Sequence, residues 1–147
     1  MESRQFCTFY VDDLFFGIEV LKVQEVIRHQ TMTCVPLAPP AVKGLINLRG
    51  QIVTAIDLGQ RLELKDREAR SLMNMVIRTD DGVVSLLVDA IGDVLEVSDD
   101  LLEAPPNTIQ GVARELITGV YKLEGRLLLV LDTEKAITVQ EEVGSKP

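Results

Sequence analysis

The chain is poor in aromatic residues and in positive charge. Of 147 residues only 4% are aromatic and none is tryptophan, while Asp and Glu outnumber Lys and Arg by 23 to 15, for a net charge of −8. A nucleic-acid-binding protein needs basic residues for the phosphates and aromatic rings for the bases. Both shortages therefore argue against nucleic acid as a partner.

Long apolar segments are absent as well. No apolar run reaches the roughly 18 residues that a membrane span requires, and residues 1–13 lack the basic and apolar regions of a secretion signal. These absences predict a cytoplasmic protein with no direct insertion into a membrane.

Cysteine and histidine are too few to indicate a metal site. Cys7 and Cys34 form no C-x-x-C pair, and His29 is the single histidine. We therefore expect free thiols, no metal and no cofactor. The motifs of common hydrolases, metalloproteases and nucleotide-binding proteins are missing, and His29 has no nucleophile pattern beside it. The sequence predicts no catalytic residue, which favours an interaction protein over an enzyme.

What the chain does contain is short aliphatic segments separated by turn signals. Hydrophobic residues make up 46% of the sequence despite the few aromatics. Apolar runs flank Arg49-Gly50, Asp80-Asp81-Gly82 and Glu124-Gly125, each of which is typical of a hairpin turn. The pattern predicts a mainly β protein with short helices.

The chain also repeats itself. Residues 44–57 align with 119–132, with identical residues at Gly44/Gly119, Leu48/Leu123, Gly50/Gly125 and Asp57/Asp132, and residues 12–27 align with 80–95. Copies of half this length bury too little surface to be stable alone. We therefore expect one domain, 1–147, made of two small β-barrels on a shared aliphatic core, at 12–70 and 72–136. The N-terminal strand, 5–11, could be exchanged between them.

One hairpin carries an unusual face. Strand alternation places Ile46 and Leu48 on one side, and Leu45, Asn47 and Arg49 on the other. An amide and a guanidinium side by side suit protein recognition, but the residues alone favour a solvated turn arginine followed by a positive-φ glycine. Val20, Val23 and Val26 leave a similar choice between core and an exposed interface strip, with core slightly favoured.

Four segments together resemble the CheW family of chemotaxis coupling proteins. They are IEVLKVQEVI (18–27), VKGLINLRGQIVTAIDL (42–58), LLVDAIGDVL (86–95) and ITGVYKLEGRLLLVLD (117–132), and the resemblance covers about Phe6 to Ala136. It implies two SH3-like five-stranded barrels around a shared hydrophobic core, without catalytic activity or cofactor. It also implies an adaptor that links chemoreceptors, the methyl-accepting chemotaxis proteins, to the histidine kinase CheA.

The resemblance also implies where the partners bind. Receptor hairpin tips would contact a groove at Val23, Glu25, Gly44, Asn47, Leu48, Arg49 and Gly50. The regulatory domain of the kinase would pair with apolar positions at Val20 and Val23. A second kinase contact would lie in the loop Ala104–Thr108, at Pro105, Pro106, Asn107 and Thr108. The resemblance thus implies that Arg49 is a receptor-binding residue, whereas the residues alone favoured a solvated turn arginine.

Two further points follow from the residues. Ser85-Leu86-Leu87 stands where a glycine is common in the family, and the chain ends within a few residues of the second repeat. The second point favours a stand-alone coupling protein over a CheV-type fusion. The alternative function, a small-molecule-binding sensory β-barrel domain, would need a pocket with convergent polar groups, for which core-facing positions offer few polar residues.

Overall fold

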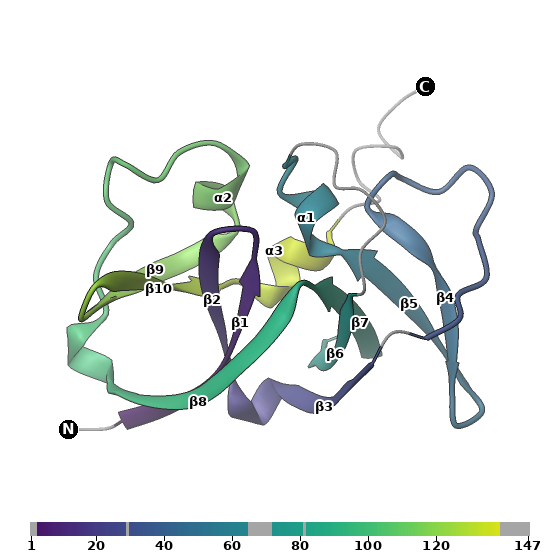
Figure 1. Ribbon diagram of the computed structural model, residues 1–147, viewed down its shortest axis with the longest axis horizontal. Coiled ribbons are helices and arrows are strands. Elements are labelled where there is room, and N and C mark those ends of the chain that lie inside the picture. The colour runs from purple at the N-terminus through teal and green to yellow at the C-terminus, as the bar shows by residue number, and fades with distance from the viewer. Residues whose placement is uncertain (1–2, 29, 65–71, 81, 139–147) are drawn as a thin grey trace.

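Strands dominate the computed structural model, which describes residues 3–28, 30–64, 72–80 and 82–138 (Figure 1). They form two five-stranded sheets. Sheet A has the order β8 (Ala90–Ser98), β1 (Ser3–Val11), β2 (Leu14–Glu19), β10 (Arg126–Leu131), β9 (Ile117–Leu123). Sheet B has the order β3 (Val23–Ile27), β6 (Met73–Thr79), β7 (Gly82–Val88), β5 (Gln51–Asp57), β4 (Val42–Leu48). The prediction of a mainly β fold is confirmed.

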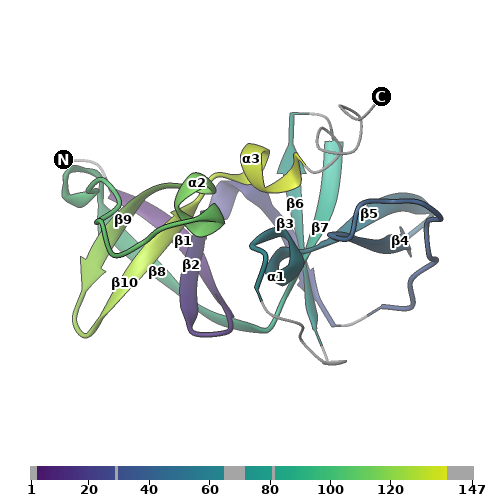
Figure 2. The ribbon, with the colours of Figure 1, turned by 90° about the horizontal axis from the view of Figure 1, so that it is seen from above.

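Short helices lie next to the ends of strands. They are η1 (Val20–Lys22), α1 (Leu58–Arg61), η2 (Asp99–Leu101), α2 (Val112–Glu115) and α3 (Thr133–Ile137). Viewed from above, the two sheets stand side by side with α1, α2 and α3 near the line between them (Figure 2). None of the helices in the described ranges has the length and apolar character of a membrane span.

Neither sheet closes into the barrel that was expected. Within the described residues, β8 is not paired with β9, and β3 is not paired with β4. A chain segment covers the outer edge of β4 instead, because Thr33 and Leu45 exchange two backbone hydrogen bonds of 2.8 Å. Glu103 and Val120 do the same beside β9 at 2.8 Å. The edge strands β4 and β9 are thus each protected by one bridge rather than by a full ladder.

The two repeats exchange strands with each other. By the sequence alignment, β2–β3 corresponds to β7–β8 and β4–β5 to β9–β10, so both sheets have the same order of corresponding strands. Sheet A combines β1–β2 of the first copy with β8–β10 of the second, and sheet B combines β6–β7 with β3–β5. The segments 12–70 and 72–136 therefore do not coincide with the two sheets. Two strands of each copy cross over, and not the segment 5–11 alone, because the chain passes between sheets at η1 and at Asp89.

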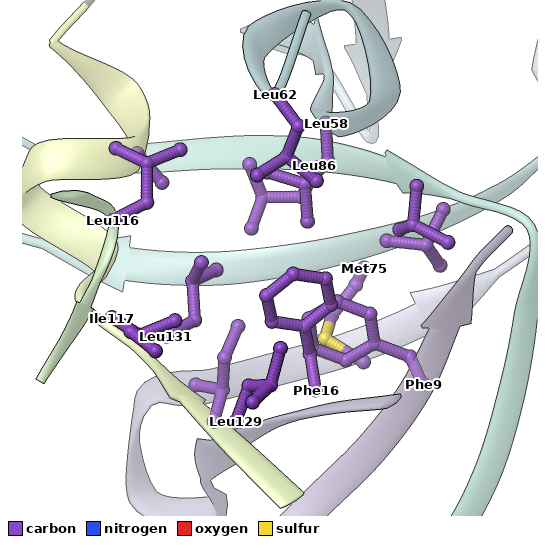
Figure 3. Close-up of a cluster of buried hydrophobic side chains, with 14 of the residues drawn as sticks. Phe9, Phe16, Leu58, Leu62, Met75, Leu86, Leu116, Ile117, Leu129 and Leu131 are labelled. Carbon is purple, nitrogen blue, oxygen red and sulfur yellow. The ribbon is translucent and has the colours of Figure 1, made fainter. Parts of the chain in front are cut away.

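A shared hydrophobic core joins the sheets, as expected. It includes Phe9 and Phe16 of sheet A, whose rings stack with centroids 5.6 Å apart, and Met75 and Leu86 of sheet B (Figure 3). Smaller clusters fill each sheet alone: Ile46, Leu48, Val53, Ala55, Val76 and Leu87 in sheet B, and Phe6, Phe15, Tyr121, Leu128 and Val130 in sheet A. Truncating a large residue in such a core to alanine costs about 2–5 kcal/mol.

Two of the identical pairs in the repeat have physical explanations. A Cβ on Gly44 would lie 2.6 Å from the Thr33 carbonyl oxygen, and one on Gly119 would lie 2.7 Å from that of Glu103. Only glycine lets the bridging segment approach so closely. Asp57 and Asp132 cap α1 and α3, because their Oδ1 atoms accept from the Gln60 and Lys135 amides at 3.3 and 3.2 Å.

Candidate functional site

The β4–β5 hairpin ends in a tight two-residue turn. Arg49 and Gly50 both have positive φ, +52° and +88°, which is the conformation of a type I′ turn. The Asn47 side chain fixes this turn, since its Oδ1 accepts a hydrogen bond of 2.8 Å from the Gly50 amide. The turn therefore presents the Arg49 side chain from a well-defined backbone.

An ion pair joins this turn to the opposite edge of sheet B. A terminal nitrogen of Arg49 donates to Oε2 of Glu25, which lies on β3. Strands β3 and β4 are the two edges in the strand order, so the pair spans the open side of a strongly curled sheet. The Arg49 side chain is 67% exposed and that of Glu25 22%. At such exposure an ion pair stabilises the fold little, and its main effect is to fix the position of two charged groups on the surface.

The outer face of the hairpin combines polar and apolar groups. Ile46 and Leu48 point into the sheet B cluster while Asn47 is exposed, as the alternation predicted. Ile52, directly opposite Asn47 in the ladder, is 61% exposed. The sequence did not single out Ile52, because an isoleucine in a strand is normally buried.

The remaining predicted receptor positions are less accessible. Gly44 and Leu48 are buried, the first against the Thr33 segment and the second in the sheet B cluster. Val23 is half-buried against the shared core. Five of the predicted receptor positions are therefore at least partly exposed: Val23, Glu25, Asn47, Arg49 and Gly50. Gly44 and Leu48 are buried and support the hairpin from within.

The segment where the chain crosses from sheet A to sheet B is partly apolar on its surface. Val20 and Val23 are half-buried, but Leu21 between them is 86% exposed. Val26 and Val94, which match each other in the repeat, are 37% and 56% exposed on β3 and β8. This strip is therefore neither wholly core nor wholly surface, since Val20 and Val23 are half-buried while Leu21 and Val26 are exposed.

The predicted second kinase contact is an ordered loop. Pro105 and Pro106 are half-buried, and Asn107 and Thr108 are exposed. Arg114 of α2 holds the loop by donating to the Pro106 and Ile109 carbonyls at 2.7 and 3.0 Å. Figure 1 places this loop at the opposite end of the long axis from the β4–β5 hairpin.

The described ranges contain no cluster of side chains that suits a metal ion. No three His, Cys, Asp or Glu side chains there are placed to hold a metal ion, and His29 lies outside those ranges. Burial raises the pKa of the Cys7 thiol, while Cys34 is exposed and well separated in the sequence. A cavity of about 370 Å³ between the ends of β1, β2 and β8 contains Arg4. Its guanidinium is already paired with Glu19, at 3.0 Å, and with Asp99.

The comparisons with known proteins bear on this arrangement. A family model described as "CheW-like domain" matches residues 5–141. The chain belongs to the CheW family. It is 30% identical to the chemotaxis protein CheW of Treponema pallidum, over 95% of this chain and 85% of that protein. It is 32% identical to that of Rhizobium meliloti, over 95% and 90%, and 31% identical to that of Thermotoga maritima, over 97% and 95%.

A solved structure has the same fold. The scaffolding protein TtCheW from Thermoanaerobacter tengcongensis superposes with a TM-score of 0.80 at 23% identity, over 88% of this chain and 89% of that one. The family resemblance seen in the sequence is thereby confirmed, and with it membership in a family of chemotaxis scaffold proteins.

Proposed function

We propose that this CheW-family chain is a non-catalytic adaptor that couples chemoreceptors to the histidine kinase CheA. Receptor hairpin tips bind the face formed by Val23, Glu25, Asn47, Arg49 and Gly50, which we call the receptor face, with Gly44 and Leu48 beneath it. The regulatory domain of CheA binds at Val20 and Val23 and, in a second contact, at Pro105, Pro106, Asn107 and Thr108. The protein works in the cytoplasm, held at receptor arrays through its partners.

The observation that carries this proposal is the difference between the two repeated sheets. Both have the same strand order, but only sheet B joins its hairpin turn to its edge strand by an ion pair among the described residues. In sheet A the matching positions are Glu124 and Asp93, two acidic residues that cannot form an ion pair with each other. The two sheets thus share one strand arrangement, but sheet B alone has this pairing of charges on its surface among the described residues. That surface combines charge, an amide and the exposed Ile52, which suits recognition of a protein.

The arrangement of the surfaces suits coupling. The hairpin, the crossover segment and the loop 104–108 lie at one end, in the middle and at the other end of the long axis (Figure 1). An adaptor that holds two partners in register can shift the active population of the kinase through binding energy alone.

Charge reversal at Arg49 tests the receptor face. Arg49→Glu removes the ion pair and places two carboxylates together, so we expect receptor-fragment binding at least 10-fold weaker, with an unchanged circular dichroism spectrum. Glu124→Arg is the matched control, because it reverses charge at the corresponding turn of sheet A, and it should bind normally. Equal binding by wild type and Arg49→Glu in co-sedimentation would remove the receptor face from the proposal.

The coupling itself is tested with the kinase. Autophosphorylation of CheA in the presence of receptor should change when this protein is added, and Arg49→Glu should lose that change while still binding the kinase. A thermal-shift screen against metabolites serves the sensory-domain alternative. That alternative would be favoured if the rate of CheA autophosphorylation did not change when the protein is added and if a metabolite raised the melting temperature of the protein.

A further inference from the structure

The interior of sheet B contains a hydrogen-bonded polar pair among apolar side chains. Asn74 on β6 and Ser85 on β7 are both fully buried. Ser85 Oγ donates to Asn74 Oδ1 at 2.8 Å, and Asn74 Nδ2 donates to the Arg28 carbonyl at 3.0 Å. A buried amide or hydroxyl is unfavourable unless its hydrogen bonds are made. This pair therefore needs an explanation beyond packing.

The corresponding place in sheet A shows that the fold does not need a polar pair. The 68-residue offset of the repeat matches Asn74 with Phe6, and Ser85 with Gly17. Phe6 is fully buried there, and its Cβ lies 3.3 Å from where a Gly17 Cβ would be. One copy thus fills this space with a ring over a glycine, and the other with two hydrogen-bonded polar groups.

The edge strands beside these two places also differ. In sheet A the β1–β8 ladder continues past Phe6 and Leu95 as far as Ser3 and Ser98. In sheet B the matching β6–β3 ladder ends at Asn74 and Ile27. Beyond this point the Asn74 side-chain amide donates a hydrogen bond to the next carbonyl of the chain, that of Arg28. A side chain thus holds the end of β3, whereas backbone ladder bonds hold the corresponding part of β8 in sheet A.

The other end of β3 is held in a similar way. Arg78, also on β6, donates from Nη1 to the carbonyls of Leu21 and Val23, both at 3.2 Å. Between these two anchors the ladder has a register shift, and Glu25 follows directly after it. The position of Glu25 therefore depends on how firmly both ends of a short edge strand are fixed.

We propose that Asn74, oriented by Ser85, is a positioning residue for the receptor face. It fixes the C-terminal end of β3 and so keeps Glu25 where it meets Arg49. This inference rests on the proposed function, because it concerns the same face, and it adds a pair that touches no partner. The serine that departs from the family pattern thereby has a role.

The test uses the full-length double variant Asn74→Leu, Ser85→Ala. Replacing both partners with apolar groups of similar size is close to neutral for stability. Because Arg28 is an exposed residue, we expect water to replace the lost amide at its carbonyl. We expect binding to a receptor fragment to weaken about 5- to 20-fold, with unchanged binding to the kinase regulatory domain. Hydrogen exchange of those β3 amides that bond to β6 should accelerate by at least 10-fold near the C-terminal end of the strand.

Thr8→Val is the matched control. Thr8 is buried on β1 and donates to the Asp93 carbonyl of β8, so the substitution removes the same kind of bond beside the other edge strand. It should leave receptor binding unchanged. In a background that lacks both members of the ion pair, Glu25→Ala with Arg49→Ala, the double substitution should have no further effect on receptor binding, because a positioning residue acts only through the pair it positions.

The outcomes separate the two proposals. If Arg49→Glu weakens receptor binding and the double variant does not, Asn74 has no positioning role and the receptor face stands. If neither change weakens binding, the receptor face itself is wrong. Equal loss of kinase and receptor binding would mean general destabilisation and overturn the inference. Should the double variant not fold, Ser85→Ala alone must still accelerate exchange of the β3 amides that bond to β6, and unchanged protection of those amides would overturn the inference as well.

Discussion

At the scale of single residues, the sequence predicted exposure well where strand alternation decides it. Asn47 faces outward and Ile46 faces inward, because alternation follows from backbone geometry, whereas the exposed Arg49 lies in the turn just after the strand. Two facts could not be predicted this way. Glu25 and Arg49 are 24 residues apart, and only the curl of the sheet brings them together. Asn74 has no partner in its own segment, and its bonds to Ser85 and Arg28 depend on which strands become neighbours.

Tyr121 supports a prediction at this scale. It is buried in the sheet A cluster, its hydroxyl has no hydrogen-bond partner in the described part of the chain, and burial raises its pKa above the ordinary value of 10.0. The neutral phenol is therefore favoured in the folded state. Its contribution is complete below pH 10 and is lost as the pH rises toward the higher pKa of the folded state.

We expect the free energy of unfolding of the wild type to decrease as the pH rises above 10. Tyr121→Phe should remove part of this dependence and leave stability at pH 7 within about 1 kcal/mol of wild type, because no hydrogen bond is lost. Urea denaturation at pH 7 and at pH 10.5 measures both. A variant as sensitive to alkaline pH as the wild type would show that Tyr121 is not the group responsible.

At the scale of elements, the hairpins were predicted because their turns carry local signals. Arg49-Gly50 and Glu124-Gly125 both connect antiparallel strands, β4–β5 and β9–β10. The apolar pattern of Leu21–Ile27 is compatible with a helical turn and with a bulged strand, and the structure contains both, η1 followed by β3 with a register shift. Short segments with two marginal options are decided by their neighbours rather than by their own propensity.

The caps of α1 and α3 give a prediction for these elements. Asp57 and Asp132 occupy corresponding positions and accept corresponding amide hydrogen bonds. Removing an N-cap side chain costs about 0.5–2 kcal/mol. Asp57→Ala and Asp132→Ala should each lower the free energy of unfolding by about 1 kcal/mol, measured by urea denaturation.

Asn substitution provides the control for the caps. Asp57→Asn and Asp132→Asn retain an oxygen that can accept the amide hydrogen, so they should recover most of the loss. If both alanine variants were as stable as the wild type, the repeated aspartates would owe their identity to something other than capping.

At the scale of the whole molecule, composition and the repeat predicted two β units and a common aliphatic core, and both are present. The sequence could not predict which strands pair with one another. Corresponding strands of two similar copies have similar apolar patterns, so β2 pairs as plausibly with β5 of its own copy as with β10 of the other. Only the paths of the chain at η1 and Asp89 select the second arrangement.

Strand exchange makes a prediction about a divided chain. Residues 1–64 and 72–147 expressed separately each hold strands of both sheets, β1–β5 and β6–β10, so neither piece can complete a sheet. We expect each alone to give amide spectra without native dispersion, and the two mixed to recover it. A single piece with native dispersion would show that one copy folds without exchange.

The crossovers also decide how the molecule would carry a mechanical load. A receptor gripping the sheet B hairpin and a kinase gripping loop 104–108 would pull on the two ends of the long axis (Figure 1). The chain passes from one sheet to the other twice, because β2 continues into β3 and β7 into β8. Two covalent connections therefore hold the sheets together across the middle of the molecule. Full separation would require a strand to be pulled out of one of the sheets, which breaks its interstrand hydrogen bonds. A small displacement at one end is therefore transmitted along the backbone to the other end instead of being lost at a soft joint.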